Sequence, residues 1–79
     1  MIYIKDKEHL KDRIVFYLKR RDGGSIDAIS EMFDECVYAI MDYLNTHQGI
    51  CQDKIDAIVF DYLELSPNFT NMILGYIGL

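Results

Sequence analysis

SIDAISEMFDECVYAIMDYLNTH, residues 25–47, is the stretch that decides the fold of this chain. From Ile26 onward it contains neither Gly nor Pro. Apolar residues recur in it at the helical spacing of three or four: Ile26, Ile29, Phe33, Val37, Ile40 and Leu44. At roughly 100° per residue, a second set widens this stripe to about half the helix circumference: Met32, Cys36, Ala39, Met41 and Tyr43. A helix that only lies on a surface needs an arc of about 100°, so the pattern predicts a long central helix with neighbours on two sides.

The remaining face of this predicted helix is acidic. It carries Asp27, Glu31, Asp34, Glu35 and Asp42, with Tyr38 among them. A turn at Asp34-Glu35 would divide the helix and give the fold a fifth one. The apolar stripe continues across that point without a change of phase, so we expect a single helix over residues 26–46.

Three shorter helices are predicted over residues 6–21, 53–65 and 67–77. Asp6 suits the N-cap of the first, and Gly23-Gly24 suits its end, since Gly adopts the left-handed conformation at low cost. Asp53-x-x-Asp56 is similar to a capping box at the start of the third helix. Ser66-Pro67 marks the start of the fourth, where the missing N–H of Pro loses no hydrogen bond.

Residues 2–5, IYIK, alternate weakly in polarity and are predicted to form an extended arm, with residues 49–51 as the candidate pairing partner. The predicted fold is therefore a single all-α domain of residues 1–79. It is a small four-helix orthogonal bundle, or a five-helix one if a turn divides the central helix, with a short extended N-terminal arm.

Cysteine content and hydropathy restrict the class of protein. Two cysteines, Cys36 and Cys51, are too few for a disulfide scaffold, and we expect free thiols in a reducing, cytoplasmic environment. The N-terminus lacks the basic and apolar pattern of a secretory signal. No apolar run approaches the ~20 residues that a membrane span needs, so we expect a soluble protein without a membrane partner.

Charge is distributed unevenly along the chain. Residues 1–21 hold seven basic and three acidic groups, a net charge of +4, and residues 22–79 hold Lys54 against ten carboxylates, a net charge of −9. Together they give the net charge of −5. Such asymmetry suggests that one part meets an acidic partner or the other a basic one, although a charged helix face is often only solvated.

Three aromatic residues interrupt polar helix faces. Phe16 lies between Arg13 and Arg20 on a basic face, whereas Tyr38 and Phe60 lie on acidic ones. Aromatic side chains ringed by charge are typical of the centres of protein interfaces. The candidate partner-binding residues are Phe16, Arg13, Arg20, Tyr38, Glu31, Glu35, Asp42 and Phe60.

Two stretches are similar in outline to DNA-binding helix–turn–helix or winged-helix domains. The first is residues 13–44, with the turn at Asp34-Glu35; the second is residues 59–79, whose Leu63-x-Leu65-Ser66-Pro67 is similar to the turn of that motif. Neither supplies Arg or Lys on its second helix. Because phosphate neutralisation by those residues provides most non-specific affinity, nucleic acid is the less favoured partner.

The sequence contains no residue pattern typical of a catalytic site or of a metal site. His47, Cys51 and Asp53 have no second Cys/His pair to complete a tetrahedral site, and no nucleophile, base and orienting group share a recognisable signature. We expect that the protein is not an enzyme and that it binds neither a metal ion nor a cofactor. The sequence predicts a small acidic module that binds another protein stoichiometrically, as an accessory, regulatory or inhibitor-type protein. The opposite charges around Phe16 and Tyr38 also predict a two-fold homodimer; a degenerate helix–turn–helix DNA-binding regulator is the alternative.

Overall fold

Four α-helices and one short 3-10 helix make up most of the chain in the computed structural model, which describes residues 4–47 and 49–78. In chain order they are α1 (Ile4–Asp22), α2 (Ile26–Thr46), α3 (Gln52–Leu63), η1 (Pro67–Phe69) and α4 (Thr70–Ile77). These two ranges contain no strand. The predicted small all-α bundle is confirmed, and α2 runs unbroken across Asp34-Glu35 as expected.

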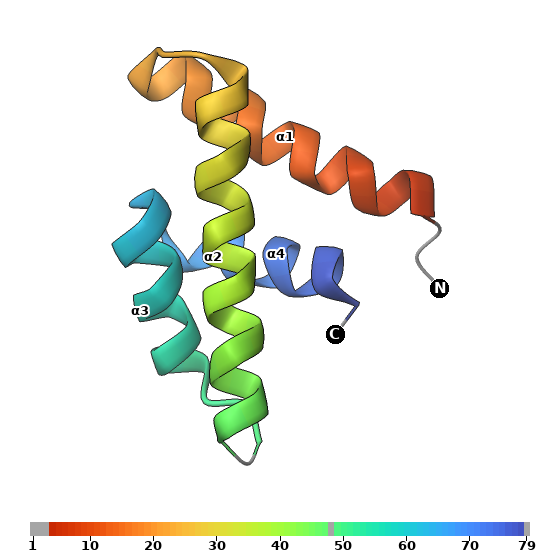
Figure 1. Ribbon diagram of the computed structural model, residues 1–79, viewed down its shortest axis with the longest axis vertical. Helices are drawn as coiled ribbons and strands as arrows, with labels where there is room; N and C mark the ends of the chain where they lie inside the picture. The colour runs from red at the N-terminus through yellow and green to blue at the C-terminus, as the bar shows by residue number, and fades with distance from the viewer. Residues whose placement is uncertain (1–3, 48, 79) are drawn as a thin grey trace.

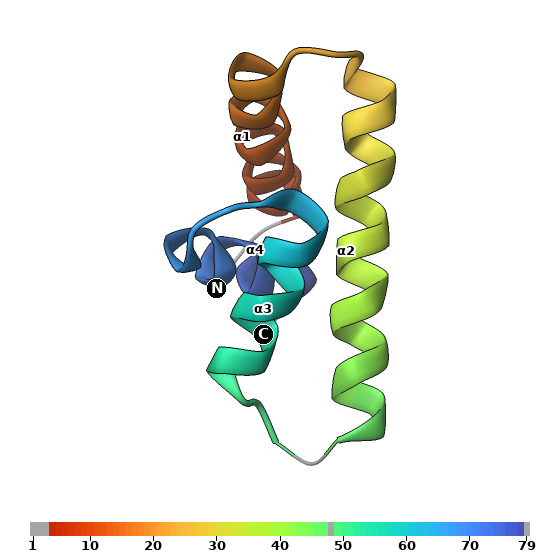
Figure 2. The ribbon, with the colours of Figure 1, turned by 90° about the vertical axis from the view of Figure 1, so that its left-hand side faces the viewer.

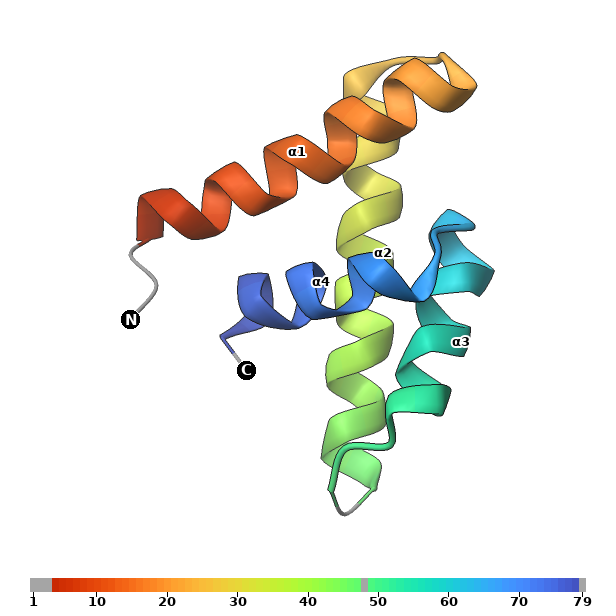
Figure 3. The same cartoon turned by 180° about the vertical axis from the view of Figure 1, so that it is seen from behind.

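The helices are arranged in two layers. Helix α2 stands alone along one side of the molecule, and the other elements lie together on the other side (Figure 2). Helices α1 and α4 run across α2, whereas α3 returns alongside it in the antiparallel direction (Figure 1). Seen from behind, α1 and α4 lie next to each other in front of α2 (Figure 3). Helix α2 packs against both α1 and α3. These partners lie in one layer, so the prediction that α2 has neighbours on two sides is wrong.

The core lies between these two layers. Its buried apolar residues come from every α-helix and from the loop after α3: Ile14, Val15, Leu18, Ile29, Phe33, Cys36, Val37, Ile40, Ile55, Val59, Leu63, Leu65, Ile73 and Leu74. Phe33 is fully buried. Its ring meets the edge of Tyr76 from α4, with centroids 5.1 Å apart, and Lys11 Nζ lies 5.6 Å from its centroid. One α2 side chain thus joins α2 to both α1 and α4.

The covered part of the α2 stripe is narrower than the sequence predicts. Ile26, Met32 and Met41 are 50%, 44% and 43% exposed. All the packing partners of α2 lie in one layer, so the margins of a stripe spanning half the helix remain in water. Tyr17 on α1 and Tyr62 on α3, both predicted for apolar faces, are likewise exposed.

Helix α1 begins earlier than predicted. It starts at Ile4, so Asp6 lies inside the helix and is not its N-cap. Residues 4 and 5 of the predicted extended arm are helical, and residues 1–3 lie outside the described residues. The run from Lys5 to Glu8 contains no helix breaker, and its Lys and Glu favour helix, which explains the extension.

The starts of the three helices predicted after α1 have different outcomes. Ser25 caps α2 as predicted, with its Oγ accepting a hydrogen bond from the Ala28 N–H at 3.1 Å. The capping box at Asp53 is wrong: α3 starts at Gln52 with Cys51 as N-cap, and Asp56 accepts a hydrogen bond from the Gln52 side chain at 3.1 Å. The predicted helix over 67–77 is divided into η1 and α4.

Arg21 connects the end of α1 to the end of α3. Its Nη1 donates to the Glu64 carbonyl at 2.7 Å and its Nη2 to the Leu63 carbonyl at 2.9 Å. Helix α3 has no basic residue in its last turn, and Glu64 ends it in the left-handed conformation at φ 52°. A cation near carbonyls at a helix C-terminus is favourable. Arg21 therefore supplies α3 with the charge that its own sequence lacks.

The Asp22 carboxylate orients the guanidinium group of Arg21. Arg21 Nε and Nη2 donate to the two Asp22 carboxylate oxygens at 2.9 Å and 2.6 Å. These hydrogen bonds raise the pKa of Arg21 and lower the pKa of Asp22 below its usual 3.8. A lowered carboxyl pKa stabilises the folded state above about pH 4, and this contribution is lost as the pH falls further.

Replacing Arg21 with Gln is expected to lower the free energy of unfolding by about 1 kcal/mol, because two carbonyls at the end of α3 lose a charged donor. Thermal unfolding followed by circular dichroism should show a midpoint lowered by about 4–8 °C for a domain of this size. Arg20→Gln is the matched control, since Arg20 lies beside Arg21 but makes no recorded hydrogen bond among the described residues. Equal stability of the two variants would contradict the role of Arg21.

Candidate protein-interaction surface

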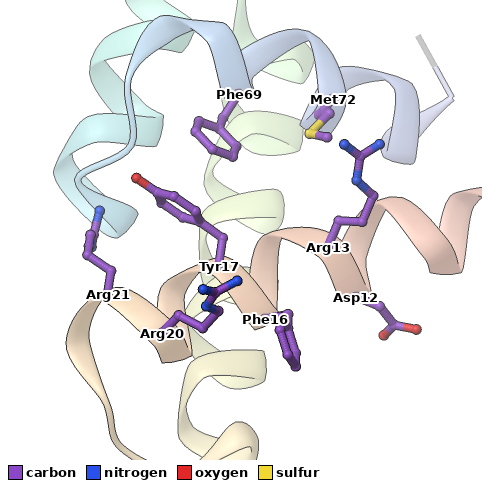
Figure 4. Close-up of a pocket in the computed structure, with 8 residues that line it drawn as sticks. All are labelled: Asp12, Arg13, Phe16, Tyr17, Arg20, Arg21, Phe69 and Met72. Atoms are coloured by element: carbon purple, nitrogen blue, oxygen red, sulfur yellow. The ribbon is translucent and has the colours of Figure 1, made fainter.

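A hollow of about 840 Å3 lies between α1 and the chain that runs from η1 into α4. Its lining comes from α1, η1 and α4: Asp12, Arg13, Phe16, Tyr17, Arg20, Arg21, Phe69 and Met72. Figure 4 looks onto these residues with α2 behind α1 and α4. The hollow, called the α1–α4 groove below, therefore opens away from α2.

The helical spacing of α1 divides its groove residues into two sets. Tyr17 points toward η1, where its ring packs against Phe69 with centroids 4.9 Å apart (Figure 4). Arg13 extends toward Met72 from the same helix. Phe16 projects from α1 on the side away from α4 and is 61% exposed. The groove thus has an apolar wall at η1 and α4 and an aromatic side chain at its outer edge.

Arginine gives the groove a positive charge. Arg13, Arg20 and Arg21 line it together with one carboxylate, Asp12. Arg21 is already bonded to Asp22 and to the end of α3. Arg13 and Arg20 have no ion-pair partner among the described side chains. Two guanidinium groups beside an exposed Phe are therefore available to a ligand.

A second candidate surface is the outer face of α2. Glu31, Glu35, Tyr38 and Asp42 are all exposed on it, and Tyr38, at 69%, has the largest exposed fraction among the large hydrophobic side chains that the structure describes. Phe33 and Ile40 lie on the opposite side of the same helix and are fully buried. The acidic face therefore points away from the second layer. Asp34, predicted for this face, instead pairs with Lys11 of α1 at 3.0 Å.

The structure brings together some of the predicted partner-binding residues and separates others. Phe16, Arg13 and Arg20 share the α1–α4 groove, whereas Tyr38 and its carboxylates form the outer face of α2. Phe60, on α3, is exposed as predicted but does not line the groove. Tyr17 and Phe69 lie on helix faces that the sequence predicts to be apolar. Their pairing as a groove wall depends on how α4 packs against α1, which the apolar pattern of each helix does not determine.

No group of three or more His, Cys, Asp or Glu residues in the described part of the chain is placed to hold a metal ion. His47 instead closes the end of α2: its ring stacks on Tyr43 with centroids 4.2 Å apart, and its Nδ1 lies 3.0 Å from the Tyr43 carbonyl. Cys36 is buried and Cys51 is exposed, both as free thiols. None of the helices described is long and apolar enough to cross a bilayer.

The two thiols should differ sharply in reactivity. Burial raises the pKa of Cys36 to about 11, so at about pH 8 roughly one Cys36 thiol in a thousand is ionised, and the reactive species is the thiolate. A thiol reagent should label one cysteine per native chain rapidly and the second only after denaturation. Mass spectrometry after timed labelling measures this. Fast labelling of native Cys51→Ser protein would show that Cys36 is accessible.

No family model, curated protein or solved structure matches the chain.

Proposed function

We propose that this protein is a non-catalytic interaction module that binds another protein stoichiometrically through the α1–α4 groove. The observation that supports this most is the 61% exposure of Phe16 beside Arg13 and Arg20, at the edge of a hollow walled by Tyr17 and Phe69. Aromatic and arginine side chains dominate the energetic centres of protein interfaces. A role as an accessory, regulatory or inhibitor-type protein would fit such binding.

Burial of Phe16 gives a partner a source of affinity. Moving a Phe side chain fully out of water contributes about 1.5–3 kcal/mol. The cost of ordering it is small, because an aromatic ring has two rotatable bonds and α1 already fixes its backbone. The exposed Phe16 is therefore suited to being covered by a partner rather than to staying in water.

The groove lining indicates the chemistry of the partner. Arginine pairs with carboxylates through two parallel hydrogen bonds, so Arg13 and Arg20 favour a segment carrying Asp or Glu. The ring of Tyr17 and the thioether of Met72 favour apolar side chains between those carboxylates. An acidic amphipathic helix meets both requirements, and helix-in-groove docking is a recurrent mode of recognition.

DNA binding is the second candidate, favoured by the same cluster of arginines. The geometry of both helix–turn–helix frames weighs against it. In the first, Asp34-Glu35 lies inside the unbroken α2 and there is no turn. In the second, Thr70 lies on the helix that would face the nucleic acid, but its side chain is fully buried. A groove walled by aromatic rings also fits a peptide better than a phosphate backbone.

The proposal can be tested in two steps. A partner is first captured from host extract, and its dissociation constant is then measured with the purified partner. Phe16→Glu should weaken binding at least tenfold, or about 1.4 kcal/mol, because a carboxylate replaces the apolar anchor. Ile50→Glu is the matched control: Ile50 is similarly exposed, at 54%, but lies outside the groove. Equal binding by both variants would contradict the groove as the binding site.

The DNA alternative has its own measurement. A mixed-sequence duplex should show no retention at about 50 mM salt, because the groove offers too few cations for counterion release to drive binding. Retention at that salt, lost steeply as salt rises and abolished by Arg13→Ser/Arg20→Ser, would favour nucleic acid as the partner.

A further inference from the structure

Two rows of side chains on opposite sides of the molecule have the same spacing and opposite charge. On α1, Phe16 is flanked by Arg13 three residues before it and Arg20 four residues after it. On α2, Tyr38 is flanked by Glu35 three residues before it and Asp42 four residues after it. We call these the arginine row and the carboxylate row. All six residues are exposed.

The spacing places the charges of the two rows in register. At about 1.5 Å of rise per residue, the outer members of each row are separated by about 10.5 Å along their helix. Residues three and four apart also share one helix face. Two helices laid along each other would therefore bring both carboxylates to the two arginines at once, with the rings of Phe16 and Tyr38 between them. The Arg13 side chain, which extends toward Met72, would turn toward Phe16 in this arrangement.

We propose that a second copy of this chain is an occupant of the arginine row, and that it docks through its carboxylate row. This inference rests on the proposed function, because it uses the edge of the α1–α4 groove as a protein-binding surface. Glu31, one turn before Glu35 on the same exposed face, extends the acidic surface. Met32 and Met41, at its margins, are 44% and 43% exposed and supply apolar area.

The position of the two rows determines the kind of assembly. The carboxylate row faces outward from the α2 layer, opposite the buried Phe33 and Ile40. The arginine row lies on α1 at a groove that opens away from α2 (Figure 4). A two-fold dimer would need both rows on one face so that two equivalent contacts form together. Rows on opposite sides give head-to-tail association instead, which continues beyond a pair.

Salt should control this association strongly. Both rows are exposed, so their charges are screened by ions. Raising the salt from about 50 mM to about 500 mM shortens the Debye length about threefold and should weaken association at least tenfold. Sedimentation equilibrium at loading concentrations up to roughly 500 µM can detect weak association, with dissociation constants of about that concentration. The expected result at low salt is a mean mass that rises with concentration past that of a dimer.

Two variants with complementary defects test the head-to-tail geometry. Arg13→Ser/Arg20→Ser removes the arginine row and keeps the carboxylate row. Glu35→Gln/Asp42→Asn removes the charges of the carboxylate row without creating a second basic row, and it keeps the arginine row. Each variant alone should remain monomeric. Mixed in equal amounts, they should form a one-to-one pair and nothing larger, because only one intact row of each kind remains. Formation of this pair also shows that both variants are folded. Phe60→Ser, an exposed aromatic on α3 outside both rows, should assemble like the parent.

Each other result overturns the inference. A parent that stays monomeric at low salt excludes self-association, and a mass that stops at a dimer excludes the head-to-tail arrangement. Failure of the mixed variants to pair excludes the contact between the two rows. The proposed function is judged separately, by the loss of a captured partner in Phe16→Glu. A monomeric parent that still binds such a partner leaves the groove as a binding site for a different protein.

Discussion

One requirement of α2 governs the rest of the structure: the helix must bury an apolar stripe on one side while its carboxylates stay in water on the other. Phe33 and Ile40 are fully buried and Tyr38 is 69% exposed on the same helix. This difference allows only one layer of elements to pack against α2. Helices α1 and α4 both run across α2 because they share that single layer, and the groove lies between them.

The second layer is held together at its ends by a contact that is distant in sequence. Arg21, at the end of α1, donates hydrogen bonds to the carbonyls of Leu63 and Glu64 at the end of α3. The contact joins the end of α1 to the point where the chain turns from α3 toward η1. Since η1 and α4 follow directly, the same tie helps to position Phe69 opposite Tyr17, where the two rings form the wall of the groove.

Charge segregation gives the molecule two distinct surfaces. The arginines of α1 accompany exposed Phe16, and the carboxylates of α2 accompany exposed Tyr38. In an isolated monomer, neither aromatic ring is buried, so neither contributes hydrophobic free energy. The like charges around each ring also repel one another. We therefore propose that a partner of opposite charge would stabilise each surface, and a second copy of the chain carries such a surface.

The sequence by itself determined the helices that local chemistry specifies. The apolar period of residues 26–46 predicted one unbroken helix, Ser25 capped it, and the exposure of Phe16, Tyr38 and Phe60 followed from their polar neighbours. The capping box at Asp53 failed because Asp53 lies inside α3, which starts at Gln52 with Cys51 as N-cap, and the Asp56 side chain accepts a hydrogen bond from Gln52 instead. Only the tertiary structure decided which helices share a layer. It directed Arg21 to α3, buried Thr70 and Leu65, turned Tyr17 toward Phe69, and placed the two charged rows on opposite sides. Helical periodicity fixes which face of each helix is apolar, but not which other helix covers that face, because many packings bury similar apolar area.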